Sequence, residues 1–480
     1  MPSARAAPAP TVVTLTFDDG DANQFAAARS MAAHGLFGTF YITTSWVGDD
    51  GYLTREEVDD LAAAGHEIGG HTVTHADLTA VPPAEMEAEI CNGRAVLESW
   101  GHRPTNFSYP YSTTSPEVRG LAAGCGYTTA RELGDVASPF GCLGCPVAET
   151  MPPLDPHHLR APAQVDARWT LDQLKRAVTE AVHGGGGWVV LTFHRVCAPI
   201  GTAACPVDLS TSPALFNAFA AWLDAFRDDP ANNTTVRTVA DTVQQYRGPD
   251  QPDYQPARTA LPRPPEPEGA NALSNPSLEV VDPATGFPSC WLPAGWGDRR
   301  TRWETVSPGR SGAVAQQLRI SQHEDGDAKL VPTMDLHTCA PTVRPGAHYE
   351  VSGWYRSTGR TQIAVYYRDA SWNWITWESS SWFETSPDAW AQARFITPPV
   401  PDHATALAFG LVLAGEGTLT TDDYVMAETD ARPSAVPSSD VEDTMSLADS
   451  PYVWSFLGAL VLQAVLFAGR PSRHRRRTAS

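Results

Sequence analysis

The sequence predicts an α/β domain with a largely parallel sheet or barrel, followed by an all-β domain and a terminal membrane helix. Three observations predict this order. In the first half of the 480 residues, short apolar runs alternate with amphipathic stretches. Tryptophan-rich stretches of period 2 follow, which is the pattern of a β-sandwich. Near the end, an uncharged apolar stretch precedes a cluster of arginines.

The charge balance limits the classes of partner. Asp and Glu number 55 against 34 Lys and Arg, which gives a formal charge of -21. Nucleic-acid binding is not expected, because it needs a basic face to meet the phosphates. A neutral polymer such as a glycan suits this chain better than an anionic ligand captured by long-range attraction.

The α/β domain is expected over residues 11–246. Strands are predicted where β-branched and apolar residues run together, at Val12–Phe17, Gly38–Ile42, Glu67–Gly70 and Trp188–Phe193. Amphipathic helices are predicted at Thr54–Ala64, Pro83–Trp100 and Thr170–His183. Titratable residues directly follow several of these strands. In a β/α barrel the carboxyl ends of the strands are where active sites assemble.

These strand ends carry residues that can bind a metal and transfer protons. His71 and His75 are four residues apart, and on a helical turn both imidazoles would project to one side. Two imidazoles and one carboxylate make three ligands for zinc or a similar ion, which leaves room for water. Because Asp18 and Asp19 are adjacent, one can bind the metal while the other acts as general base. His194 could protonate a leaving amine.

In this order, the motifs resemble those of the polysaccharide deacetylases of carbohydrate esterase family 4. The family's first motif, T-F-D-D, is matched by Thr16–Asp19, and its second, H-[ST]-x-x-H, by His71–His75. Its last motif, a strand ending in L-x-H, is matched in part by Thr192–His194. The resemblance covers about residues 11–245 and implies a distorted (β/α) barrel as the catalytic domain.

The resemblance also implies roles for the residues at these positions. Asp18 would be the catalytic base and His194 the acid, with Asp19, His71 and His75 as the metal ligands. The metal would be zinc, with cobalt or nickel as alternatives. The substrate would be a polysaccharide or oligosaccharide, and the reaction hydrolysis of an N-acetyl amide or an O-acetyl ester.

The third motif departs from the family pattern R-x-P-Y. In Ser108–Tyr111, a serine stands where the family has the arginine that pairs with the catalytic aspartate, so the base could be held differently. Tyr111 would still offer its backbone N–H to an oxyanion. Thr192 replaces the leucine expected to line the acetyl pocket, which leaves the acyl preference open. Asp135 is a candidate for the carboxylate that orients the acid; the alternative is an ordinary loop residue.

Residues 272–427 hold most of the 15 tryptophans and are expected to form a β-sandwich. Period-2 stretches recur at His348–Tyr355 and Gln362–Arg368. The domain resembles jelly-roll carbohydrate-binding modules at three places, Asn275–Glu279, Val351–Tyr355 and Asp422–Tyr424.

This domain offers two candidate sites. Trp372, Trp374 and Trp377 could form a sugar-stacking platform, because aromatic faces suit the apolar face of a pyranose ring. The alternative is that they are core tryptophans. Glu279 and Asp422 could hold a structural calcium.

The 8 cysteines are even in number, which indicates disulfides formed in an oxidising compartment. Cys197–Cys205 and Cys290–Cys339 are predicted pairs, because each lies within one expected domain. Cys142 and Cys145 form a lone C-x-x-C with no second pair, so a zinc or redox site is not expected there.

The remaining segments predict linkers and an anchor. Residues 247–271 are proline-rich and favour an extended spacer, and residues 428–450 read as a flexible stalk. Residues 452–469 form the predicted single transmembrane helix, and the basic residues 470–480 its cytoplasmic tail. This topology predicts a single-pass cell-membrane protein with its catalytic domain outside. No export signal is visible before residue 11, so we expect that the true start lies upstream or that the signal has been trimmed.

Three functions can be considered for these residues. A deacetylase is favoured, because both Asp18 and His194 are retained. A glycan-binding surface protein with impaired catalysis would explain Ser108. A metallopeptidase would need the glutamate of H-E-x-x-H, and this sequence has Thr72 at that position.

Overall fold

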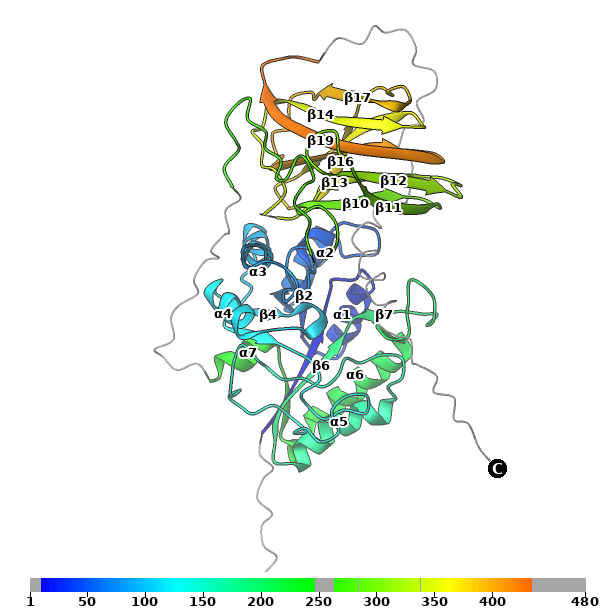
Figure 1. Ribbon diagram of the computed structural model, residues 1–480. Helices are drawn as coiled ribbons and strands as arrows, with labels where there is room; N and C mark the ends of the chain where they lie inside the picture. Colours follow the sequence, from blue (N-terminus) through cyan, green and yellow to red (C-terminus); the bar gives the residue numbers. More distant parts are fainter. Residues whose placement is uncertain (1–9, 247–262, 284, 337, 434–480) are drawn as a thin grey trace, which may run out of the picture. The chain divides into compact units, whose positions relative to one another are not determined.

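The computed structural model describes residues 10–246, 263–283, 285–336 and 338–433 (Figure 1). The chain divides into two compact units, Met1–Pro262 and Arg263–Ser480. The predicted membrane helix at 452–469 lies outside the described residues. Among the helices that are described, none has the length and apolar character needed to cross a membrane.

The first unit is built on a parallel sheet with the strand order β5-β4-β3-β2-β1-β6, and β9 pairs with the first half of β1. The strands are β1 Thr11–Phe17, β2 Gly38–Ile42, β3 Glu67–Gly70, β4 Asn106–Ser108, β5 Thr129–Arg131, β6 Gly187–Phe193 and β9 Thr234–Val236. The four predicted strands are confirmed to within one residue. The three short strands β4, β5 and β9 were not predicted.

Helices connect the strands of this sheet (Figure 1). They are α1 Gln24–Ala32, α2 Arg55–Ala63, α3 Pro83–Ser99, α4 Pro116–Gly124, α5 Leu171–His183, α6 Pro213–Asp228 and α7 Val239–Gln244, with 3-10 turns η1 Thr44–Trp46, η2 Pro110–Ser112 and η3 Pro230–Asn232. Thr54 and Thr170 start α2 and α5 as complete capping boxes with Glu57 and Gln173. These boxes satisfy the free N–H groups of each first turn, which explains why both helices begin where the sequence predicts.

The ends of the sheet are joined by irregular chain rather than by a strand pair. β5 and β6 do not pair within the described sheet. Instead, Leu159 forms a bridge with Arg131 on β5, and Glu149 forms a bridge with Trp188 on β6. The segment from 149 to 159 therefore spans the interval between the two edge strands, which fits the predicted distorted barrel.

Alternation along the strands separates an apolar face from a polar one. Leu15 and Phe17 of β1 belong to the main hydrophobic core, and Phe107 and Ala130 belong to a second core cluster. The residues next to them in sequence, among them Ser108 on β4, lie on the opposite face. This face carries the polar side chains of the candidate site described below.

The second unit is a β-sandwich of two five-stranded antiparallel sheets. One sheet has the order β10 Trp291–Trp296, β13 Asp327–Pro332, β18 Ala406–Leu413, β15 Thr361–Arg368, β16 Trp374–Ser379. The other has the order β11 Arg300–Val306, β12 Ala315–Ser321, β19 Gly417–Thr429, β14 His348–Ser357, β17 Ser386–Ile396. Leu330 and Phe409 of the first sheet share one core with Val351 and Met426 of the second.

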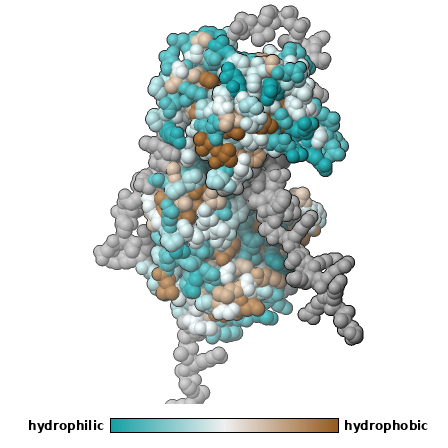
Figure 2. Space-filling model, viewed as in Figure 1, coloured by the Kyte–Doolittle hydropathy of each residue, from teal (hydrophilic) through white to brown (hydrophobic). Residues whose placement is uncertain are grey.

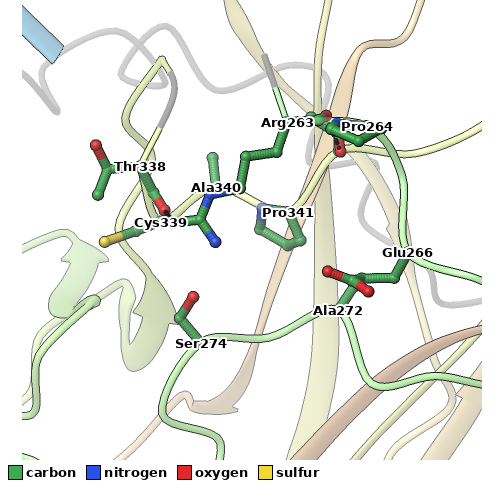
Figure 3. A pocket seen from close by; sticks show the side chains of 10 residues that line it. Arg263, Pro264, Glu266, Ala272, Ser274, Thr338, Cys339, Ala340 and Pro341 are labelled. Atoms are coloured by element: carbon green, nitrogen blue, oxygen red, sulfur yellow. Dashed lines mark hydrogen bonds between the residues drawn. The ribbon is translucent and has the colours of Figure 1, made fainter. Parts of the chain in front are cut away.

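The second unit begins earlier than predicted. Residues 263–271 were assigned to the spacer, but Gly269 donates its N–H to the Glu428 carbonyl at 3.0 Å. Thr342 Oγ1 donates to the Arg263 carbonyl at 2.7 Å, and Figure 3 shows a pocket between this segment and residues 338–342. The segment is therefore part of the sandwich, and the boundary at 272 was wrong.

Four disulfides join the eight cysteines. The predicted pairs Cys197–Cys205 and Cys290–Cys339 are confirmed. Cys91 pairs with Cys125, and Cys142 with Cys145, so the C-x-x-C closes on itself. On the face shown in Figure 2, hydrophilic residues cover much of each unit and are interspersed with small apolar patches.

Candidate active site

The turn after β1 places two adjacent aspartates at the edge of the sheet. Asp19 has a φ of 77° and Gly20 a φ of 86°, so the chain turns sharply there. The buried Gln24 side chain donates from Nε2 to the Asp18 carbonyl at 2.5 Å and to the His194 carbonyl at 3.0 Å. One amide at the start of α1 thus fixes the ends of β1 and β6 relative to each other.

Asp19, His71 and His75 form a compact group of possible metal ligands. Each offers one ligand atom, and these atoms all lie within 4.8 Å of one another. Both imidazole Nε2 atoms lie 3.3 Å from Asp19 Oδ1. That oxygen is buried and makes no hydrogen bond to the described residues. A carboxylate and two imidazoles are a donor set that zinc accepts, so the predicted ligands fit a divalent ion.

A backbone carbonyl fixes the orientation of His71. Its Nδ1 lies 2.8 Å from the Ser108 carbonyl oxygen, which can only accept a hydrogen bond. Nδ1 therefore carries a proton, and Nε2, which faces Asp19, is the atom that the neutral imidazole would offer to a metal. This is the outer-shell contact that metal-binding histidines usually have.

The two histidines lie on a loop, and the predicted helical turn was wrong. Thr72 and His75 have φ values of 68° and 61°. Glu89 of α3, only 1% exposed, accepts the N–H groups of Val73 and Thr74, both at 2.9 Å. His75 N donates to Thr72 Oγ1 at 2.8 Å. The imidazoles converge because a buried carboxylate holds the loop between them.

We expect Glu89→Gln to weaken zinc binding about tenfold, the scale of an outer-shell change. A glutamine can place its single carbonyl oxygen against both loop N–H groups, but a neutral amide oxygen holds them more weakly than a carboxylate does. The loop should then lose the shape that brings His71 and His75 together. Zinc titration measures the effect. The control is Glu117→Gln, which changes an exposed glutamate of α4. Unchanged zinc affinity in Glu89→Gln would show that the hydrogen bonds from the loop to Glu89 do not support the metal ligands.

Asp18 is buried against a cation that the sequence motifs did not reveal. Arg131 Nη2 lies 2.5 Å from both Asp18 carboxylate oxygens, and Ser108 Oγ donates to Oδ2 at 3.1 Å. Burial raises the pKa of Asp18, but the charges of Arg131, His71 and His194 more than offset this and hold that pKa below its usual value. Asp18 is therefore ionised in the folded protein, as a base must be.

His194 and Tyr111 lie beside this group. His194 lies close enough to both carboxylates that a positive charge on its ring contributes to lowering the pKa of Asp18 and of Asp19. Its Nδ1 is buried and has no hydrogen-bond partner among the described residues. Tyr111, 48% exposed and with a φ of 56°, packs its ring 4.7 Å from that of His75.

The candidate carboxylate for orienting the acid has a different partner. Asp135 Oδ2 lies 3.1 Å from His158 Nε2, and Glu132 also faces that imidazole at 3.4 Å. Asp135 is therefore an ordinary loop residue, which was the alternative to a role in orienting the acid. Thr192 likewise bonds within the sheet, with its Oγ1 2.9 Å from Thr16 Oγ1.

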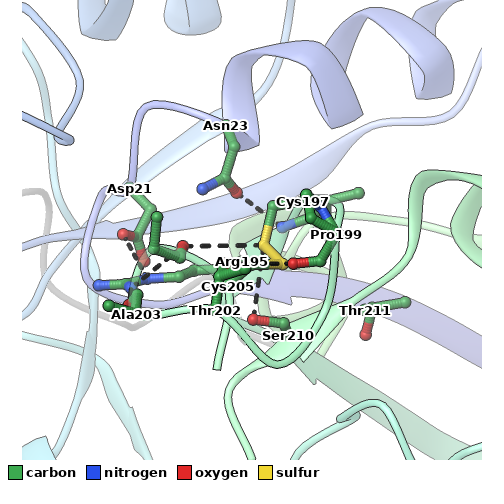
Figure 4. Close-up of a disulfide and its surroundings, with 12 residues drawn as sticks. Asp21, Asn23, Arg195, Cys197, Pro199, Thr202, Ala203, Cys205, Ser210 and Thr211 are labelled. Carbon is green, nitrogen blue, oxygen red and sulfur yellow. Dashed lines mark hydrogen bonds and ion pairs between the residues drawn. A yellow bond between two sulfur atoms is a disulfide. The ribbon is translucent and has the colours of Figure 1, made fainter. Parts of the chain in front are cut away.

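The segment after His194 is tied to the turn after β1 (Figure 4). Arg195 Nε donates to Asp21 Oδ1 at 2.9 Å, and Val196 N donates to Asn23 Oδ1 at 2.6 Å. The disulfide Cys197–Cys205 closes the following loop, which is also held by the short strands β7 Arg195–Val196 and β8 Ser210–Thr211. These contacts restrict His194 to the edge where Asp18 lies.

In the second unit the three candidate tryptophans are partly buried. The buried Arg368 guanidinium lies 4.5 Å from the ring centre of Trp372 and 5.8 Å from that of Trp374. Trp377 packs against the hydrophobic core beside Tyr367. All three have packing roles, as in the core alternative, and sugar stacking on their remaining faces stays a prediction.

Glu279 and Asp422 hold one loop of the sandwich. The Glu279 carboxylate accepts Ala313 N at 3.0 Å, and Asp422 Oδ2 accepts Arg310 N at 2.7 Å. A Cβ placed on Gly309 would lie 2.4 Å from the Val314 carbonyl oxygen, 2.5 Å from that of Ser311 and 2.9 Å from Asp422 Oδ2. Three oxygens therefore converge on the space above that glycine.

Comparisons with known proteins match the first part of the chain. Residues 5–130 match the family model described as polysaccharide deacetylase. A chitooligosaccharide deacetylase of Bradyrhizobium sp. is 31% identical over 119 residues, covering 24% of this chain and 52% of that protein. A peptidoglycan-N-acetylglucosamine deacetylase of Bacillus cereus is 26% identical over 120 residues, covering 25% and 54%. The chain thus spans about half the length of these curated relatives.

Among solved structures, a family 4 acetyl xylan esterase from Clostridium thermocellum in complex with a cobalt ion is 17% identical. The match covers 49% of this chain and 91% of that chain, with a TM-score of 0.32. Residues 5–130, which form part of the first unit, are therefore similar to the polysaccharide deacetylase family in sequence.

Proposed function

We propose that the chain is a metal-dependent deacetylase that hydrolyses the N-acetyl amide of amino sugars in a polysaccharide or oligosaccharide. One observation carries this proposal: an ionised, buried Asp18 lies beside the three possible metal ligands Asp19, His71 and His75. The names of the curated relatives, which include chitooligosaccharide and peptidoglycan deacetylases, support an N-acetylated glycan as substrate.

A divalent ion held by Asp19, His71 and His75 would polarise the acyl carbonyl and lower the pKa of a bound water to about 7. Zinc fits the donor set, and cobalt or nickel are accepted by similar sites. Asp18 then accepts a proton from the attacking water, because its carboxylate is ionised and lies beside the three metal ligands. His194 returns a proton to the departing amine. The Tyr111 N–H stabilises the oxyanion of the tetrahedral intermediate.

A panel of acylated glycans tests the proposal. Acetate release is measured from N-acetylglucosamine oligomers, peptidoglycan and acetylated xylan, with zinc or cobalt added. Release from the first two would establish an N-deacetylase, and release from xylan alone would make the enzyme an O-acetyl esterase. Glycan binding without release from any substrate would support the alternative, a surface protein with impaired catalysis.

We also propose that this domain acts outside the cell, with residues 452–469 as its membrane anchor. The proposal rests on the uncharged apolar run and the arginines that follow it. Membrane fractionation of cells that express the chain, with and without residues 452–480, tests it. Recovery of both forms in the soluble fraction would contradict the anchor.

A structural calcium is proposed for the space above Gly309. Calcium takes carbonyl and carboxylate oxygens at about 2.3–2.6 Å, and three such oxygens converge there. We expect added calcium to raise the melting temperature of the chain, and Asp422→Asn to abolish that rise. A melting temperature that does not respond to calcium would contradict the calcium site. Asp422 and Glu279 would then only accept hydrogen bonds, such as those from the backbone of residues 310–314.

A further inference from the structure

The carboxylate of Asp18 has its cationic partner on a strand that no sequence motif marks. Asp18 is 3% exposed and Arg131 is 1% exposed, so neither charge is shared with solvent. Arg131 Nη2 bonds to both Asp18 oxygens at 2.5 Å. The family pattern would place the arginine at position 108, where this chain has serine.

The pairing of β4 with β5 explains how an arginine on another strand reaches the same place. Ser108 and Arg131 are register partners, so their side chains emerge next to each other on the same face. Arg131 Nη2 also donates to Ser108 Oγ at 2.6 Å, and Ser108 Oγ donates to Asp18 Oδ2. The small serine leaves the space that the guanidinium occupies and donates a further hydrogen bond to the carboxylate.

A third side chain fixes the guanidinium. The ring of Tyr41, which is fully buried on β2, lies 5.2 Å from the Arg131 guanidinium carbon. The cation thus lies over an aromatic ring, and its Nη2 bonds to a hydroxyl and a carboxylate. Such a site suits arginine far better than lysine, whose ammonium has no plane to stack.

We propose that Arg131 is the positioning residue for the base Asp18, and that Ser108 and Arg131 together replace the single arginine of the family motif. This inference rests on the proposed function. It assigns Ser108 to an intact site and removes the main argument for impaired catalysis. Arg131 acts through Asp18 and does not touch the metal ligands in any contact described above.

Kinetics of four variants of the full chain test the inference. We expect Arg131→Met to lower kcat about 100-fold, because a shift of about 1 Å in a catalytic group can cost that much. KM and zinc affinity should stay close to wild type. Arg131→Lys should recover part of the loss in kcat, because lysine keeps the positive charge but lacks the planar guanidinium. The control is Arg176→Met, which changes an exposed arginine of α5.

The fourth variant, Ser108→Arg with Arg131→Ser, moves the arginine to the family position. Recovery of kcat above that of Arg131→Met would show that the guanidinium at Asp18 matters and not the strand it comes from. An Arg131→Met protein with wild-type kcat would overturn the inference.

Thermal unfolding separates this inference from the proposed function. In a double-mutant cycle, Arg131→Met should lower the melting temperature more when residue 18 is aspartate than in Asp18→Asn, because only the aspartate leaves a buried charge unpaired. If wild type released no acetate, the proposed function would fail, while the cycle would still measure the pairing. Equal shifts in both backgrounds would overturn the inference.

Discussion

Asp18→Asn is expected to lower the rate of acetate release by about 10²–10⁴-fold, the usual contribution of a general base. Asparagine has nearly the same shape as aspartate and can still accept the Ser108 hydroxyl, but it cannot take a proton from water. Zinc should remain bound, because the three possible ligands are Asp19, His71 and His75. Steady-state kcat and zinc stoichiometry, measured on the same sample, check both parts of the prediction.

The matched control is Asp172→Asn, which changes an exposed aspartate at the start of α5. It should leave both kcat and zinc content unchanged. If Asp18→Asn kept the wild-type kcat, another group would have to be the base. If it lost zinc together with activity, Asp18 would instead be part of the metal site.

The second large effect is expected from His71→Ala. His71 is 2% exposed, and its imidazole is held between Asp19 and the Ser108 carbonyl. Removing one of three protein ligands should reduce zinc affinity by more than the roughly 100-fold upper effect of an outer-shell change. Acetate release at stoichiometric zinc should then disappear. Zinc titration and acetate release measure the two effects independently.

His183→Ala, which removes an exposed histidine in the last turn of α5, serves as the control for His71→Ala. Partial recovery of activity at high zinc concentration would agree with a weakened site. Full zinc affinity in His71→Ala would exclude His71 as a ligand, even if activity were lost.

The predictable part of the first unit is the part with long apolar patterns. β1, β2, β3 and β6 are runs of four to seven residues that are largely buried on both faces, and β-branched and apolar residues make up most of β1, β2 and β6. β4 and β5 have three residues each, and their inward positions are polar, as at Ser108 and Arg131. A pattern of apolar residues cannot reveal strands of this kind.

The same limit applies to the candidate site. Asp18, Asp19, His71, His75 and His194 follow predictable strands, and the structure brings them to one edge of the sheet. Arg131 and Glu89 could not be predicted, because their roles depend on a strand register and on the contact of α3 with a loop. The helical turn expected at His71–His75 failed for the same reason: hydrogen bonds from outside the segment determine its shape.

The most direct test of the proposed function is acetate release from N-acetylglucosamine oligomers by the purified chain, stripped of metal and then given one equivalent of zinc. We expect no release before zinc, release after it, and no release with zinc in Asp18→Asn or His71→Ala. Release by the stripped chain would contradict a metal-dependent mechanism. Bound zinc with no release from any acylated glycan would contradict the proposed deacetylase.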